Sequence, residues 1–396
     1  MKGEFMKKLS VMISLFMATV GFAYAQAQPP RGTIRTFATG IYNQSIVIDA
    51  SGNLWIASAP PLILQMDEKK TGGISFGNIG FTNHKIDIKF VPAVSGQTTL
   101  IEVSPAGAVM RAINQVAPPE WPAGQWWGAY SLGVDAAGNI YVPMVLYEKQ
   151  QDCDFIHRCY NRAAVYLVKI NSSGLPVGTY NTARAYSDEW VPKVLVDSSG
   201  NIFVASTSDK LGEGIVSKFD PSGTMQGVLK LSNRVYAIAM DKAGNIWGTN
   251  KASDDVAGVS PAGIILPPIH ARHATTGIAI DQAGNFWVGV NSHEIEKIGP
   301  DGTILATAPT PNNTGDGPRV IRVDGAGNIW AVNQSNQPNQ GSTVLELNLQ
   351  GAVTATYPMP NAVDLAIDKQ GNVWVINSLP AGNNLYEIVG VAEGVK

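Results

Sequence analysis

Residues 278–302, IAIDQAGNFWVGVNSHEIEKIGPDG, contain the unit that decides the fold. An alternating apolar strand, Ile278 to Ile280, leads into a tight turn, Asp281 to Asn285, and a second strand with Trp287 follows. After a polar loop, a third strand from Ile295 to Ile298 ends in the turn Pro300-Asp301-Gly302. Short apolar runs bounded by Gly, Pro, Asn and Asp predict a small antiparallel sheet.

The Asp-x-x-Gly-Asn turn recurs along the chain, beginning at Asp49, Asp135, Asp197, Asp241, Asp281, Asp324 and Asp368. The intervals between these turns are 86, 62, 44, 40, 43 and 44 residues. A period of about 42–44 residues with several short strands per unit is typical of a β-propeller. No apolar pattern with a 3.6-residue period runs long enough for a helical repeat. We therefore predict an all-β fold, a β-propeller of four-stranded blades.

The first interval leaves the number of blades open. It is twice 43 residues long, and Ser95-Gly96 near its midpoint is in phase with the other turns. Eight blades are therefore favoured, seven of them clear and one degenerate. The alternative is seven blades with a strand-rich insertion at about 73–115.

The two ends of the chain predict how the ring closes. The segment GTIRTF at 32–37 resembles GTILAT at 302–307, so the first strand is expected to pair in the last blade and cover its edge. The predicted organisation is a signal peptide at 1–25, a short linker at 26–31, the propeller at 32–390 and a tail at 391–396.

The N-terminal segment predicts export. Lys7 and Lys8 precede an apolar run, and Ala23-Tyr24-Ala25 is a small-residue cleavage signal. The run is too short to span a bilayer comfortably, so the mature chain is expected to have no membrane span and to be periplasmic or secreted. Without this segment the chain has 25 basic and 30 acidic residues and no basic stripe, which argues against nucleic acid as a partner.

Each turn has a predicted physical role. The Asp side chain can accept hydrogen bonds from backbone amides two and three residues on, and the Gly takes a left-handed conformation. An aromatic ring two residues after the Asn can fill the wedge between neighbouring sheets. These aromatic residues are Trp55, Tyr141, Phe203, Trp247, Trp287, Trp330 and Trp374.

Strand direction separates two faces of the predicted disc. The Asp-x-x-Gly-Asn turns share one face, while loops of varied length gather on the other, which we expect to be the working surface. Two positions per blade are expected to face the centre, one five residues before each turn Asp and one three residues after each aromatic. A funnel for a sugar, a peptide or an anion would use the polar residues of this set, and a solvated channel rim is the alternative. The candidates are Gln44, Tyr130, Tyr236, Asn250, Arg319, Asn333 and Asn377.

The longest loop of this face, at 145–163, contains both cysteines of the chain. In an exported protein a disulfide between Cys153 and Cys159 is the expected pairing, and Cys-x-x-Cys-His spacing for haem is absent. Aromatic and arginine side chains on a stiffened loop have the composition of a partner-binding hot spot, although an ordinary surface hairpin would look the same. The candidate contacts are Phe155, His157, Arg158 and Tyr160.

Catalytic motifs are weak. His270, His273 and His293 lie on consecutive loops of the variable face and could form a metal site or supply a general base. No nucleophile elbow, His-Glu-x-x-His motif or phosphate-binding glycine loop is present. No pair of carboxylates recurs at the rim.

Units such as IRVDGAGNIWAVN at 321–333 and LAIDKQGNVWVIN at 365–377 resemble NHL-type propellers and the neighbouring streptogramin B lyase (virginiamycin B lyase) family, over about residues 31–390. The lyase resemblance implies a ring-opening elimination with a magnesium ion, histidines at the start of a blade and a Glu after a Trp-Phe-Thr strand. Here Ser, Met, Asn or Val follows the aromatic strands and no His begins a blade, so the catalytic residues are not matched. A lactonase-like propeller would need acidic metal ligands, which are not found.

We therefore expect a monomeric exported propeller that acts as a ligand- or protein-binding or scaffold module, without a resident cofactor. Its partner would be an extracytoplasmic protein, a peptide or a carbohydrate. The alternative is a metal-dependent lyase or lactonase that uses the three histidines with Mg²⁺ or Ca²⁺.

Overall fold

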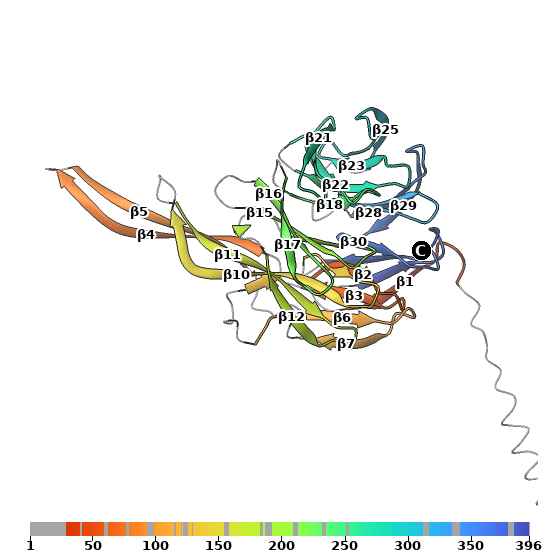
Figure 1. The fold of residues 1–396 in the computed structure, drawn as a ribbon, viewed down its shortest axis with the longest axis horizontal. Coiled ribbons are helices and arrows are strands. Elements are labelled where there is room, and N and C mark those ends of the chain that lie inside the picture. The colour runs from red at the N-terminus through yellow and green to blue at the C-terminus, as the bar shows by residue number, and fades with distance from the viewer. Residues whose placement is uncertain are drawn as a thin grey trace, which may run out of the picture.

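The protein is a seven-bladed β-propeller in the computed structural model (Figure 1). The structure describes residues 29–395 apart from 40–41, 59–61, 77–78, 93–98, 115, 120, 122–125, 129, 154–157, 183–184, 187–191, 209–212, 232–234, 251–252, 312–316, 335–340 and 379–383. The predicted signal peptide lies outside the described residues. The all-β class and the four-stranded blades are confirmed, whereas the favoured count of eight blades is wrong.

The strands of the first three blades, from the ring centre outward, are as follows. Blade 1 contains β2 (Asn43–Ile48), β3 (Leu54–Ser58), β6 (Thr99–Val103) and β7 (Val109–Ile113). Blade 2 contains β8 (Trp126–Gly128) and β9 (Gly133–Val134), then β10 (Ile140–Cys153), β11 (Arg158–Ile170), and finally β12 (Pro176–Asn181) with β13 (Ala185–Tyr186). Blade 3 contains β14 (Lys193–Val196), β15 (Ile202–Ser208), β16 (Glu213–Phe219) and β17 (Met225–Leu231).

The remaining four blades are regular. Blade 4 contains β18 (Ile238–Met240), β19 (Ile246–Thr249), β20 (Asp255–Val259) and β21 (Ile265–His270). Blade 5 contains β22 (Thr275–Ile280), β23 (Phe286–Val290), β24 (Glu294–Ile298) and β25 (Ile304–Pro309). Blade 6 contains β26 (Pro318–Val323), β27 (Ile329–Asn333), β28 (Ser342–Leu347) and β29 (Val353–Met359). Blade 7 contains β30 (Ala362–Ile367), β31 (Val373–Asn377), β32 (Asn384–Ile388) and β1 (Ile34–Ala38).

The long first interval is one blade with a hairpin inserted in it. β4 (Leu62–Phe76) and β5 (Ile79–Pro92) lie between the second and third strands of blade 1, and β6 and β7 then complete that blade. The turn at 104–107 joins β6 to β7. The insertion therefore covers 62–92 rather than 73–115, and the Ser95-Gly96 copy lies outside the described residues.

The inserted hairpin joins a second long hairpin. β5 pairs in parallel with the far end of β11, at Arg158–Tyr160, so that β4, β5, β10 and β11 form one sheet. Figure 1 shows these four strands projecting together from one side of the ring. We call the part of this sheet outside the ring the arm.

Ring closure uses the two ends of the chain. β1 pairs antiparallel with β32, from Ile34 opposite Ile388 to Ala38 opposite Asn384. An ion pair of 2.9 Å between the Arg35 guanidinium and the Glu387 carboxylate reinforces this pairing. Because the N-terminal strand supplies the outer strand of blade 7, that blade is covered in the way that the likeness of 32–37 to 302–307 indicated.

The turn aromatics pack between blades. Trp287 is fully buried in a cluster that combines blade 5 with Ile321, Ile329 and Leu345 of blade 6. Its indole Nε1 donates to the Asp281 carboxylate at 3.1 Å, and four other blades repeat this contact between Trp and Asp. Each of these turns therefore fixes the ring that fills the wedge between neighbouring sheets.

The turn itself is a network around one carboxylate. Asp281 accepts hydrogen bonds from the backbone amides of Ala283 and Asn285, which are two and four residues on rather than two and three. Gly284 has a φ of 86°, which favours glycine. Burial alone would raise the pKa of Asp281, but hydrogen bonds from Asn285, Trp287 and Ala283 outweigh it and lower that pKa.

We expect Asp281→Ala to lower the free energy of unfolding by about 1–3 kcal/mol near neutral pH, because buried donors lose their acceptor. The carboxylate is favoured in the folded state, so its contribution is present above the unfolded pKa and is lost as pH falls through the lowered folded pKa. The free energies of unfolding of the wild-type protein and the variant, measured by urea titration, should therefore become equal at acidic pH. Gln282→Ala in the same turn is the control, and an equal effect there would contradict the network.

Candidate functional site

The candidate site is a cavity of about 540 Å³ in the central channel. Its lining comes from the innermost strands of the blades and, in blade 2, from residues 130–132 just before β9, so widely separated segments of the chain contribute side chains. Among the described lining residues are three cations, Lys193, Arg319 and Arg322, and one carboxylate, Asp364. The cavity therefore carries an excess of positive charge although the whole chain has a formal net charge of −3.

A repeated irregularity at the start of the inner strands decides which residues face this channel. The register shifts between Asn43 and Ser45 in β2, between Pro318 and Val320 in β26, and between Ala362 and Asp364 in β30. The residue without a partner in the neighbouring strand lies five positions before the turn Asp in each blade: Gln44, Arg319 and Val363. This is the position that we expected to face the centre of the ring. A bulge places an extra residue in one strand and changes the phase of the residues around it.

The channel consequently contains residues that sequence analysis missed. Lys193 and Asp364 lie four positions before a turn Asp, and Arg322 lies two positions before one. The channel therefore contains a carboxylate, Asp364, which the two positions per blade chosen from the sequence did not include. The sequence contained a signal, because each of these charged residues belongs to an inner strand whose other residues are mostly apolar.

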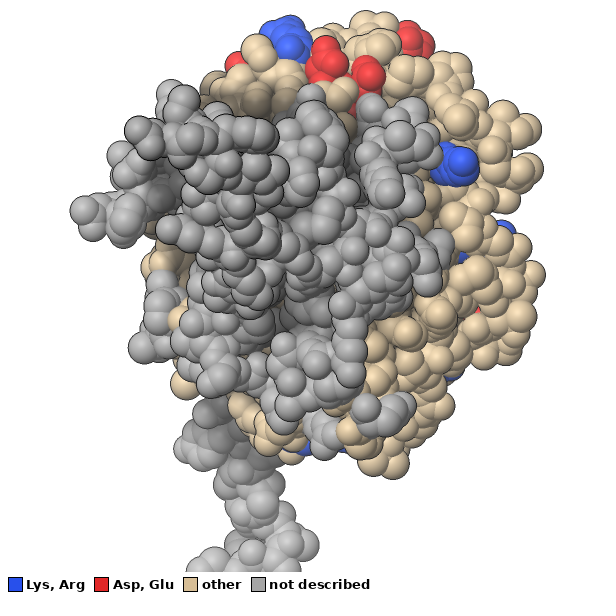
Figure 2. Space-filling view, turned by 90° about the vertical axis from the view of Figure 1, so that its left-hand side faces the viewer, with Lys and Arg blue, Asp and Glu red and all other residues tan. Residues whose placement is uncertain are grey.

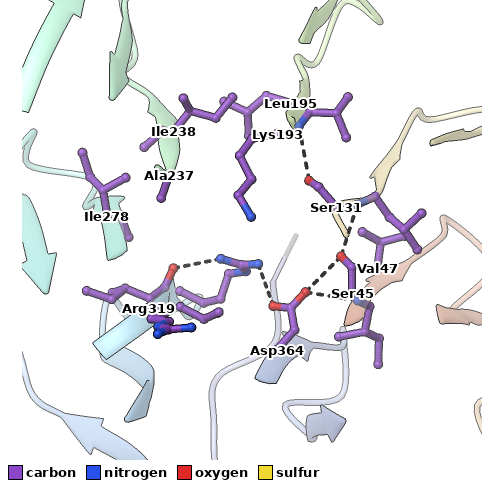
Figure 3. A pocket seen from close by; sticks show the side chains of 18 of the residues that line it. Ser45, Val47, Ser131, Lys193, Leu195, Ala237, Ile238, Ile278, Arg319 and Asp364 are labelled. Atoms are coloured by element: carbon purple, nitrogen blue, oxygen red, sulfur yellow. Dashed lines mark hydrogen bonds and ion pairs between the residues drawn. The ribbon is translucent and has the colours of Figure 1, made fainter. Parts of the chain in front are cut away.

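Lys193 is the primary amine of the cavity. Its side chain extends from β14 into the channel, toward the side that carries Asp364 (Figure 3). The pKa of Lys193 is lowered to about 8, mainly by burial: the Asp364 carboxylate raises it, and the nearby Arg319 and Arg322 lower it. Lys193 as a residue is half-buried, and it belongs to the lining of the cavity.

Opposite Lys193, Asp364 organises a hydrogen-bond network across the ring. One carboxylate oxygen accepts from the Ser45 hydroxyl and from the Ile46 amide, each at 3.1 Å, and the other accepts from the Arg322 guanidinium at 3.0 Å (Figure 3). Asp364 is buried, whereas 45% of the Arg322 side chain is exposed. The Arg322 guanidinium is thus held in place and still open to a ligand in the channel.

The predicted ligand-binding residues divide into two groups. Gln44, Tyr130 and Arg319 line the cavity. Tyr236, Asn250, Asn333 and Asn377 are not among its described lining residues. The three asparagines are buried, and Asn377 accepts a hydrogen bond from the backbone amide of Asn384, so its side chain holds a loop.

The three histidines do not form a cluster. His270 pairs through Nδ1 with the Asp255 carboxylate at 2.6 Å, and its side chain is 68% exposed. His273 is exposed, and His293, in the turn just before β24, has a positive φ of 66°. In the described part of the chain no three His, Cys, Asp or Glu side chains are grouped so that they could hold a metal ion.

The predicted partner-binding loop is the tip of the β10–β11 hairpin. Phe155 and His157 lie outside the described residues, whereas Arg158 and Tyr160 belong to β11. The backbones of Cys153 and Cys159 lie directly opposite each other, the placement that a disulfide needs, and the bond itself stays a prediction.

Figure 2 views the side of the molecule from which the arm projects. On the described surface visible there, acidic residues gather at the upper edge and basic residues are scattered. The described residues contain no helix with the length and apolarity that a membrane crossing requires.

Comparisons with known proteins agree with this fold. A scan of protein-family models and a search of curated proteins find no match. Among solved structures, the chain is similar to virginiamycin B lyase from Staphylococcus aureus, with 11% sequence identity and a TM-score of 0.58, over 90% of this chain and 99% of that one. The catalytically inactive lyase with quinupristin gives the same values.

A second similar structure is the WD40 β-propeller domain of Doa1, with 11% identity and a TM-score of 0.54, over 90% of this chain and 96% of that domain. At such identities the likeness concerns the fold and not the activity. The chain is therefore a seven-bladed β-propeller, similar in fold to the virginiamycin B lyase propellers.

Proposed function

We propose that the protein is a binding module whose central channel holds a small organic anion, such as a carboxylic acid or an acidic sugar. The observation that carries this proposal is the convergence of Lys193, Arg319 and Arg322 on one cavity with a single carboxylate. The predicted signal peptide supports a periplasmic or secreted place for this binding. No described residue cluster favours the metal-dependent lyase or lactonase over binding alone.

The residues that line the cavity suit a ligand with one anionic group and an apolar remainder. Lys193 and the exposed part of Arg322 offer N–H donors, and charge-assisted hydrogen bonds are the stronger ones in proteins. Leu195, Ala237 and Ile278 contribute apolar side chains to the lining of the same cavity. A small ligand that fits the cavity of about 540 Å³ can therefore be oriented by its anionic end and enclosed by the inner strands.

Lys193→Met should weaken binding of the anion by roughly tenfold to a hundredfold, because a charged hydrogen bond is lost. Isothermal titration calorimetry with a panel of mono- and dicarboxylates, uronic acids and inorganic phosphate measures this. Wild-type affinity should fall as pH rises through about 8, since the ammonium form of Lys193 is the one that binds an anion, and the variant should lose this dependence.

Lys242→Met is the matched control. That lysine is exposed, donates to the Gln282 carbonyl on the turn face and is not among the described residues that line the cavity. The variant removes the same charge and should leave affinity unchanged. Equal binding by Lys193→Met and wild type, or no binding by any anion of the panel, would overturn the proposal.

A further inference from the structure

Lys193 has a chemical reactivity that the binding of an anion does not use. Its Nζ is the one primary amine among the described residues that line the cavity, where the other cations are the guanidinium groups of Arg319 and Arg322. Its side chain reaches toward the middle of the cavity, and Figure 3 draws no hydrogen bond or ion pair to its amine. In contrast, Arg322, Asp364 and Ser45 are linked to one another. The amine is therefore placed where it can react with a bound molecule.

The surroundings of Lys193 favour its neutral form. Burial is the main cause that lowers the pKa of Lys193 to about 8. The charged groups that face it are Arg319 and Arg322 of β26 and Asp364 of β30, and Tyr130 is the other titratable residue of the described lining. At pH 7 about one tenth of the amine is then neutral, compared with less than about one thousandth for an ordinary lysine. Desolvation and neighbouring cations activate lysine as a nucleophile toward carbonyl groups in this way.

A carboxylate can be held beside this amine. The Arg322 guanidinium donates to Asp364 at 3.0 Å and to the Ile321 carbonyl at 3.1 Å, and 45% of the side chain is exposed. Because a guanidinium has five N–H donors, donors remain for a ligand after these two contacts. Arg322 is also close enough to Lys193 for its charge to lower the pKa of that amine. A ligand whose carboxylate lies on Arg322 therefore has its neighbouring carbon atoms near Lys193.

We propose that the ligand of the channel is an oxo acid and that Lys193 Nζ joins its carbonyl carbon in an imine. This inference rests on the proposed function and names the chemical class of its ligand. The ammonium releases one proton, the neutral amine adds to the carbonyl carbon, and the released proton returns as the carbonyl oxygen leaves as water. The products, a protonated imine and water, contain the same atoms and the same charge as the ammonium and the oxo acid. No oxidant or reductant takes part.

Reduction with borohydride traps such an imine as a stable secondary amine. The full chain is incubated with pyruvate, 2-oxoglutarate or phenylpyruvate, reduced at fixed times, and analysed by intact mass and peptide mapping. At least one of these oxo acids should give a single adduct per chain, located at Lys193. At a saturating concentration its rate of formation should rise roughly tenfold from pH 6 to pH 7 and level off above about 8, whereas an ordinary lysine keeps gaining reactivity to about pH 10.

Matched variants and ligands separate the imine from simple binding. Lys193→Arg keeps the positive charge and cannot form an imine, so it should bind the corresponding hydroxy acid within a few-fold of wild type and give no adduct. Lys242→Met removes an exposed lysine and should form the adduct at the wild-type rate. The hydroxy acid, which has the carboxylate without the carbonyl, should block trapping. Acetone, which has the carbonyl without the carboxylate, should react at least about tenfold more slowly.

Calorimetry with each oxo acid and its hydroxy acid distinguishes failure of this inference from failure of the proposed function. Binding of both acids without an adduct at Lys193 would overturn the imine and leave anion binding in place, whereas binding of neither would overturn both. An adduct that acetone forms as fast as the oxo acids would overturn the assignment of the ligand class. Adducts spread over many lysines would overturn the imine as well, and peptide mapping of the wild-type protein decides this without any variant.

Discussion

Trp330→Ala is expected to lower the free energy of unfolding by about 3–5 kcal/mol, which is the usual cost of deleting a buried Trp side chain. Trp330 is fully buried, and its cluster combines Val332 and Val344 of blade 6 with Leu365 and Val375 of blade 7. Truncation leaves a void between two sheets that their hydrogen-bonded strands cannot close. Urea denaturation followed by circular dichroism measures the loss.

Two variants bracket this result. Trp330→Phe keeps most of the ring contacts and loses the hydrogen bond from Nε1 to Asp324, so it should cost about 1–2 kcal/mol. Leu305→Ala removes an apolar side chain that is 53% exposed, so it should change stability by less than about 0.5 kcal/mol. A Trp330→Ala protein as stable as Leu305→Ala would show that the wedge between the blades is not a packed core.

Asp364→Ala is expected to destabilise the protein by about 2–4 kcal/mol, because it leaves buried donors without their acceptor. The Asp364 carboxylate joins three blades, since it belongs to blade 7 and accepts from Ser45 in blade 1 and from Arg322 in blade 6. It therefore ties the first inner strand of the chain to the last. Loss of this tie should be seen as a lower midpoint in urea.

The controls for Asp364 separate the ion pair from the hydrogen bonds. Asp364→Asn keeps an oxygen acceptor for Ser45 and Ile46 and removes the charge, so its midpoint should lie between those of wild type and the Ala variant. Asp301→Ala removes an exposed carboxylate that accepts only from Thr303 among the described contacts, and its midpoint should change little. If Asp364→Ala unfolds with the wild-type midpoint, the network does not hold the ring together.

The number of blades could not be read from spacing alone. An interval of 86 residues fits two blades or one blade with an inserted hairpin, and both contain alternating strands. The two arrangements differ in the strand with which β6 pairs. It pairs with β3 across 40 intervening residues, from Thr99 opposite Ser58 to Val103 opposite Leu54, and this long-range pairing is absent from any local pattern.

Channel residues were missed for a related reason. The alternation of side chains predicts the phase of an inner strand only if the strand is regular, and a bulge before Ser45, Val320 and Asp364 breaks that regularity. Gln44, Tyr130 and Arg319 still line the cavity, because the residues around a bulge can reach it. Only the structure shows that Lys193 and Arg322 line the same cavity.

The amino-acid sequence determined the repeat, its turn chemistry and the closure of the ring by the first strand, because each depends on contacts within one unit or on likeness between units. The pairing of distant strands decided the count of seven blades, the joining of two hairpins into an arm and the gathering of three cations around one carboxylate. Those features depend on register between segments far apart in the chain, where a shift of one residue changes which side chain faces the centre.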